Sequence, residues 1–121
     1  IEDTAVLAGG DAFSPTTSVR PNVLSVLVGF NHNLAYDSNT DIGNRRTRLA
    51  DWIVHPQNPL TSRSIANRLW LWHFGTAIAG NPNNFGSTGK RPTHPELLDW
   101  LAATLIENNW SFKAMHRLIL S

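Results

Sequence analysis

The stretch from Ser62 to Phe74 most constrains the fold, because its apolar residues fall at nearly every angle around a predicted helix. A helix that is apolar on every side is normally buried by neighbouring elements. Asn67 and Arg68 lie in the same stretch, so burial would bring two polar side chains into the interior. Buried polar groups need hydrogen-bond partners. We therefore predict that Asn67 and Arg68 are structural clamps, bonded to loop carbonyls or to carboxylates outside their own helix.

Three further segments show helical periodicity, and one long loop separates the second helix from the third. In the first helix an i, i+3, i+4 apolar pattern stops before a proline. In the third, leucines and other apolar residues occupy one arc and acidic residues the opposite one. The sequence therefore predicts a mainly α fold with about four helices. Their predicted bounds are residues 45–54, 62–74, 94–108 and 112–120.

Capping signals set the predicted ends of these helices. Gly75 is expected to be the left-handed residue that ends the second helix. Thr93 and Glu96 have the spacing of a capping box, in which each would bond the other's backbone at the start of the third helix. Ser111 is the expected N-cap of the fourth helix.

Residues 75–92 form a loop rich in glycine, asparagine and proline. Loops of this length are uncommon inside compact domains and are usually either functional or disordered. This loop has few of the charged residues that a disordered tether would carry. We predict an ordered loop, with Ile78 and Phe85 buried as anchors and its glycines supplying positive φ or close backbone approach.

Residues 1–43 carry no comparable helical pattern and are predicted to be extended or irregular. A short strand is expected at residues 4–8, ended by a turn at residues 9–11. The helical region, residues 44–121, is expected to be the N-terminal portion of a larger domain. The chain begins without Met and ends within a helical pattern, as expected of a piece of a longer protein.

Composition excludes several classes of function. The net charge is +1, with ten Lys and Arg against nine Asp and Glu, which gives no basis for nucleic-acid binding. A helix-turn-helix is also disfavoured, because the second helix lacks the polar face that recognition of a groove needs. No apolar run is long enough for membrane insertion. The absence of cysteine excludes disulfides, Cys-ligated zinc and covalently attached haem, and no cofactor is expected in this chain.

Metal and anion sites have weak support in the sequence. His94, Glu96 and Asp99 are closely spaced, but His94 and Glu96 would point to different sides of a helix, so no metal site is predicted. His73 lies in the last turn of its helix, where a cation is favourable, and a structural role is preferred over catalysis. Lys90 and Arg91 precede a helix N-terminus after a glycine-rich stretch, which leaves weak anion binding as an alternative.

Three motifs in fixed order are recognisable: NPLTSRSIANRLWLWHFG, NPNNFGSTGKRPTHPELLDWLA and NWSFKAMHRLI. They resemble a domain of unknown function from planctomycete-type bacteria, over about residues 44–121 and more weakly before them. The chain departs from the family pattern at Asn84, where an acidic residue is frequent, and at Leu71 and Trp72, where Gln-His is common. The resemblance implies an exported multidomain protein with cytochrome-c-like or carbohydrate-binding modules. It transfers no established activity.

Two functional hypotheses follow. The first is a non-catalytic accessory domain, used for scaffolding or docking against other domains of the same polypeptide. The isolated chain would then expose an apolar patch near the fourth helix and self-associate. The alternative is part of an enzyme, redox- or polysaccharide-related, whose site is shared with a C-terminal half beyond this chain. Its candidate ligand-binding residues would be Arg68, His73, Asn84 and His94.

Overall fold

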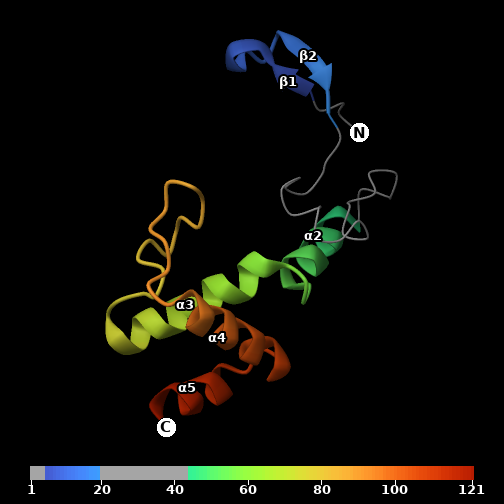
Figure 1. Ribbon diagram of the computed structural model, residues 1–121. Coiled ribbons are helices and arrows are strands. Elements are labelled where there is room, and N and C mark those ends of the chain that lie inside the picture. Colours follow the sequence, from blue (N-terminus) through green and yellow to red (C-terminus); the bar gives the residue numbers. More distant parts are fainter. Residues whose placement is uncertain (1–4, 20–43) are drawn as a thin grey trace. The chain divides into compact units, whose positions relative to one another are not determined.

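The computed structural model describes residues 5–19 and 44–121, which divide into two compact units, Ile1–Gln57 and Asn58–Ser121 (Figure 1). The described residues of the first unit form a two-stranded antiparallel sheet and the helix α2 (Arg45–Val54). The units divide between residues 57 and 58, so α2 belongs to the first unit. The division after residue 43, between an extended or irregular segment and a helical region, stays a prediction.

The sheet is a hairpin of β1 (Ala5–Leu7) and β2 (Pro15–Ser18), joined through one turn of 3-10 helix (η1, Ala8–Gly10). The predicted strand and turn are both present, and the two glycines of the turn have positive φ angles of 59° and 82°. Strand β2 was not predicted from the sequence. The extended or irregular structure predicted for residues 20–43 lies outside the described residues.

Asp11 closes the hairpin connection. Its carboxylate accepts hydrogen bonds from the Phe13 backbone N–H at 3.0 Å and from the Ser14 hydroxyl at 2.7 Å. These bonds stabilise the charged carboxylate and so hold the pKa of Asp11 below its usual value. The bond from the Phe13 backbone has the larger effect.

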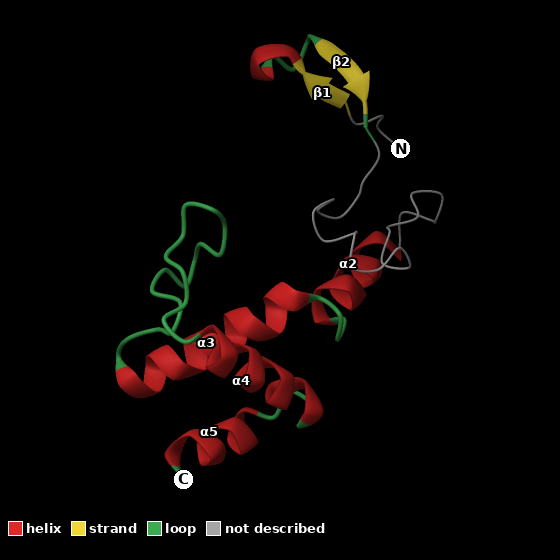
Figure 2. Ribbon diagram, viewed as in Figure 1, coloured by secondary structure: helices red, strands yellow, loops and turns green. Residues whose placement is uncertain are grey.

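The second unit consists of three helices and the long loop (Figures 1 and 2). The helices are α3 (Pro59–Phe74), α4 (Pro95–Glu107) and α5 (Phe112–Leu120). Helix α4 packs against α3, and α5 packs against both. Together with α2, these four helices confirm the predicted mainly α fold. Among the described residues, no helix is long and apolar enough to cross a membrane.

The core of this unit lies where the three helices meet. The predicted apolar arc of α4 faces it, and the acidic arc is exposed. Met115 enters from α5, and Ile78 and Ala79 enter from the loop. The largest fully buried side chains are Leu69, Leu98, Leu101, Leu105, Met115 and Asn67.

Helix α3 is buried on one side only, so the prediction that it is buried all round is wrong. Leu69 and Ala66 are inaccessible, but Trp72 is 66% exposed and Phe74 is also exposed. The helical periodicity shows where the apolar residues lie around the helix, but it does not show how many other elements are available to cover them. Within this unit two helices and one loop pack around α3, and they do not cover its whole circumference.

Helix α3 begins three residues earlier than predicted. Asn58 is its N-cap, and its side-chain oxygen accepts from the Leu60 backbone N–H at 3.0 Å. Pro59 occupies the first helical position, where its missing N–H would in any case have no partner within the helix. Gly75 ends the helix with φ 71°, the left-handed conformation that was predicted.

The predicted capping box at the start of α4 is wrong. His94 is the N-cap residue and makes no side-chain capping bond, which moves Glu96 to the second helical position. The Thr93 hydroxyl and backbone N–H both donate to the Ile78 carbonyl, at 3.3 and 2.9 Å. Thr93 therefore fastens the end of the loop to its beginning, and this long-range partner was not visible in the local spacing.

The turn between α4 and α5 uses left-handed backbone at Asn109 (φ 50°) and Trp110 (φ 59°). The Trp110 backbone N–H donates to the Leu105 carbonyl at 2.9 Å, which gives a partner to one of the free carbonyls at the end of α4. Ser111 is the N-cap of α5, as predicted, and accepts from the Ala114 N–H at 3.3 Å.

Candidate functional site

The loop of residues 75–92 is held against α3 by one buried amide. The Asn67 side chain donates to the Ala79 carbonyl at 3.0 Å and accepts from the Ala79 N–H at 2.8 Å. Asn67 is inaccessible to solvent, and Ala79 is buried beside it. The hydrogen bond predicted from the sequence is therefore present. The Asn67 amide pairs with both backbone groups of Ala79, as a residue of a neighbouring β-strand would.

The anchors of the loop are Ala77, Ile78 and Ala79, all buried. Ile78 was predicted to be an anchor, but the same prediction for Phe85 is wrong, since Phe85 is 37% exposed. The remainder of the loop is shaped by hydrogen-bonded turns and by a bridge between Ala79 and Pro92. Paired backbone at its base and local turns beyond it can order this loop without a second apolar anchor.

Gly89 fulfils the prediction of close backbone approach. A Cβ atom placed there would lie 2.0 Å from the Asn84 carbonyl oxygen, a distance that cannot be tolerated. We expect Gly89→Ala to displace the tip of the loop and to destabilise it by at least about 1 kcal/mol. The check is a comparison of backbone amide chemical shifts. Signals of residues 81–89 should move while those of the α4 core stay in place. The matched control is Gly86→Ala, whose Cβ would meet only a side-chain oxygen at 3.2 Å.

A groove of about 320 Å³ runs between the first turns of α3 and the loop. Arg68 crosses it, donating to the Asn83 side-chain oxygen at 2.7 Å. The partner is a side-chain amide rather than the predicted carbonyl or carboxylate, and Arg68 is only partly buried. Its guanidinium therefore remains within reach of solvent. The groove is lined by Leu60, Ser64, Arg68, Pro82, Asn83 and Phe85.

Of the four predicted ligand-binding residues, only Arg68 lines this groove. The Asn84 side chain is engaged within the loop, where it bonds the Thr88 hydroxyl and the Gly86 N–H, both at 3.0 Å. His94 is exposed, with its Nδ1 at 3.0 Å from the Thr93 hydroxyl. No hydrogen bond joins these residues into a single constellation.

The fourth candidate, His73, contacts His116, for which no role was predicted from the sequence. Its Nε2 lies 2.7 Å from Nδ1 of His116, across the interface of α3 and α5. The two rings meet edge to face, with centroids 4.8 Å apart and planes at 69°. Both side chains are partly buried. The two residues are 43 positions apart, so no local spacing could have indicated the pair.

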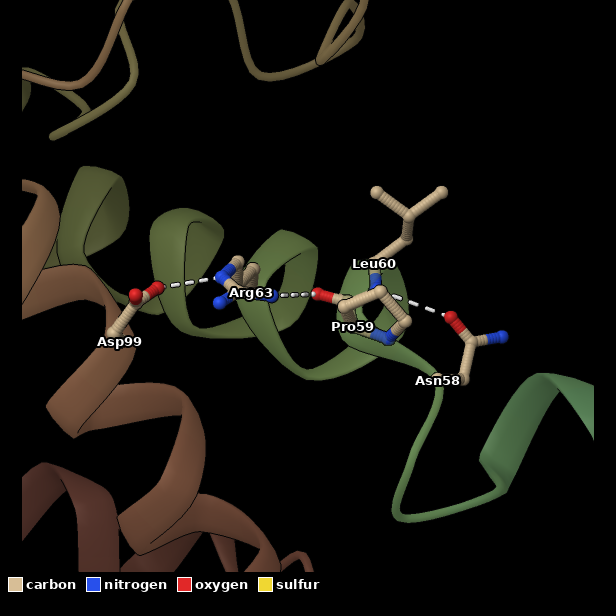
Figure 3. A network of polar contacts seen from close by, with 5 residues as sticks. All are labelled: Asn58, Pro59, Leu60, Arg63 and Asp99. Carbon is tan, nitrogen blue, oxygen red and sulfur yellow. Dashed lines mark hydrogen bonds and ion pairs between the residues drawn. The ribbon is translucent and has the colours of Figure 1, made fainter. Parts of the chain in front are cut away.

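A second interhelical polar contact lies near the start of α3 (Figure 3). The Arg63 Nε donates to the Asp99 carboxylate on α4 at 2.5 Å, and its Nη1 donates to the Pro59 carbonyl at 2.9 Å. The arginine thus ties α4 to a carbonyl of the first turn of α3. The hydrogen bond from Arg63 is the main cause that lowers the pKa of Asp99; burial opposes it, and the charge of Arg63 adds to it.

The Asp99 contact predicts a pH dependence of stability. Because the folded-state pKa lies below the ordinary value of 3.8, the contribution is complete above that value and is lost as the pH falls through the folded pKa. Asp99 is 55% exposed, so solvent screening limits the contribution to about 0.5 kcal/mol. We expect Asp99→Asn to be less stable than the wild type by this amount at pH 7, and the difference to shrink as the pH falls below 3.8. Urea unfolding at both pH values measures the difference, with Glu107→Gln on the exposed end of α4 as control.

Among the described residues, no group of three or more His, Asp or Glu side chains is arranged to hold a metal ion. The polar side chains of α3 instead make four separate contacts with its neighbours. Asn67 and Arg68 bond the loop, Arg63 bonds α4 and His73 contacts α5.

Comparison with known proteins identifies the family of this chain. No curated protein and no solved structure matches the chain. A family model does match residues 45–121, which include helices α2 to α5 and the loop. The match covers more than half of the sequence, and the chain therefore belongs to the family PSD1, described as a protein of unknown function (DUF1553).

Proposed function

We propose that the second unit, Asn58–Ser121 (the helical unit), is a non-catalytic scaffolding or docking module. The observation that carries this proposal is how the polar groups around the loop are used. Asn67 is sealed against Ala79, and Asn84 is engaged by its own loop. Catalytic side chains have to reach a substrate, whereas these amides hold backbone in place. Their arrangement supports a structural role for the loop.

The surface that would bind a partner is provided by exposed aromatic residues. Trp72 on α3 and Trp100 on α4 are 66% and 52% exposed, and Phe112 on α5 is exposed as well. Aromatic side chains are enriched in protein interfaces because they bury a large area for few rotatable bonds. Their number on one small unit supports docking. Following the family resemblance, the partners would be modules of the same exported polypeptide, cytochrome-c-like or carbohydrate-binding.

The Arg68 groove favours a second candidate, a ligand site that becomes complete when another part of the protein faces it. Its volume of about 320 Å³ lies at the lower end of the range for small-molecule sites. Arg68 and Ser64 offer it a charge and a hydroxyl from successive turns of one helix. A redox or polysaccharide-related enzyme with a shared site would use this groove.

The docking proposal is tested with the purified chain. We expect sedimentation velocity to show self-association that grows with concentration, and a hydrophobic dye to gain fluorescence on binding. Replacing Trp72 and Trp100 with glutamine should reduce both signals. The control is Phe13→Gln, which removes a 95% exposed aromatic from the hairpin. A wild-type chain that stays monomeric and binds no dye would refute the proposal. Equal loss in the control would refute the assignment of the surface.

A further inference from the structure

His73 on α3 and His116 on α5 bring two metal-binding side chains from different helices into contact. Imidazole nitrogen is the commonest protein ligand of transition metals. Here Nε2 of one ring and Nδ1 of the other face each other at 2.7 Å. Neutral imidazole has one donor and one acceptor nitrogen, so the contact can be made with a single shared proton.

We propose that His73 and His116 form a two-histidine site for a divalent metal ion of the Zn²⁺ class, which would cross-link the end of α3 to α5. Zn–N bonds of about 2.0–2.1 Å in tetrahedral geometry place two ligand nitrogens roughly 3.3 Å apart. The two nitrogens therefore need to separate by roughly 0.6 Å from the proton-shared contact, and both rings need to turn so that the nitrogens face a common point. The ion replaces the shared proton between the same two nitrogens.

The surroundings determine what else the ion would bind. The described residues supply no third histidine or carboxylate in this position, so water or a small anion fills the remaining coordination sites. His73 lies in the last turn of α3, where the helix dipole favours a positive charge. Lys113 and Arg117 flank His116 on α5 and oppose a cation, but both are exposed and their charges are screened by solvent. Their charge favours an anion as a further ligand.

A hollow of about 520 Å³ on α5 adjoins His116 and gives solvent a path to this residue. Lys113, Arg117 and Leu120 line it with His116. An open coordination position and an accessible hollow distinguish this site from a closed structural zinc site, in which four protein ligands surround the metal.

The experiment is a titration of the full chain with ZnCl₂ at pH 7.5, followed by thermal unfolding and by competition with a colorimetric zinc chelator. We expect one Zn²⁺ per chain and a rise in the unfolding midpoint of about 5 °C at saturation, reversed by a chelator. His73→Gln and His116→Gln should each abolish the rise. His94→Gln should preserve it, because His94 is exposed and lies outside the pair.

A measurement on the wild type covers the case in which a variant fails to fold. The ring ¹⁵N signals of the histidines report metal binding atom by atom, and Zn²⁺ should shift those of His73 Nε2 and His116 Nδ1. The proposal is overturned if millimolar Zn²⁺ leaves both signals unchanged, or if it shifts only those of other histidines. It is also overturned if both folded variants keep the thermal shift.

Discussion

Leu105→Ala is expected to lower the free energy of unfolding of the helical unit by about 2–5 kcal/mol, the largest single effect among these substitutions. Leu105 is fully buried, in the same core cluster as Leu69 and Met115. Truncation removes the transfer free energy of the leucine and leaves a cavity that three helices can collapse only in part. Urea unfolding followed by far-ultraviolet circular dichroism measures the change as a lower midpoint.

The control for this substitution is Leu120→Ala in α5. Leu120 is 71% exposed, so its truncation should change stability by no more than about 0.5 kcal/mol. A similar loss for both variants would mean that the core is not centred on Leu105. It would also favour a partner or second copy that covers Leu120, because only coverage would make truncation at this position costly.

The interior of the helical unit was predictable from the sequence where one element decides the outcome. The leucine arc of α4 needs only the helical period, and the Ser111 cap and Gly75 end need only local backbone chemistry. Asn67 was predictable for a related reason. An amide among apolar residues has to find a partner, and a loop rich in free backbone groups follows the same helix.

The contacts between elements were not predictable, because they depend on how the helices cross. The His73–His116 and Arg63–Asp99 contacts join residues 43 and 36 positions apart, and neither has a local signature. Burial of Trp72 was wrongly predicted for the same reason, because the sequence does not show how many elements pack around α3. The early start of α3 is a different case. Asn58 followed by Pro59 is a recognised N-terminal signal that the helical period alone did not use.

These contacts suggest how the unit divides its tasks. Helix α3 bonds the loop through Asn67. It also contacts α4 through Arg63 and α5 through His73, so it makes polar contacts with each of its neighbours in the unit. The apolar core supplies most of the stability, and the polar contacts fix the relative orientation of the elements. For a docking module this orientation matters, because the exposed aromatics belong to three different helices.

Asn67→Ala is expected to destabilise the helical unit by about 2–4 kcal/mol and to release the base of the loop. The substitution leaves both the N–H and the carbonyl of Ala79 buried without their partner, and each such group costs about 1–3 kcal/mol. Amide hydrogen exchange at Ala79 should accelerate well beyond that of the α4 core.

Asn67→Asp keeps the acceptor but loses the donor and buries a charge, so it should be no more stable than the alanine variant. The control is Arg68→Ala, which removes one exposed bond to Asn83 and should cost less than about 1 kcal/mol. If Asn67→Ala unfolds at the wild-type urea midpoint, the amide does not hold the loop, and the structural role proposed for it fails.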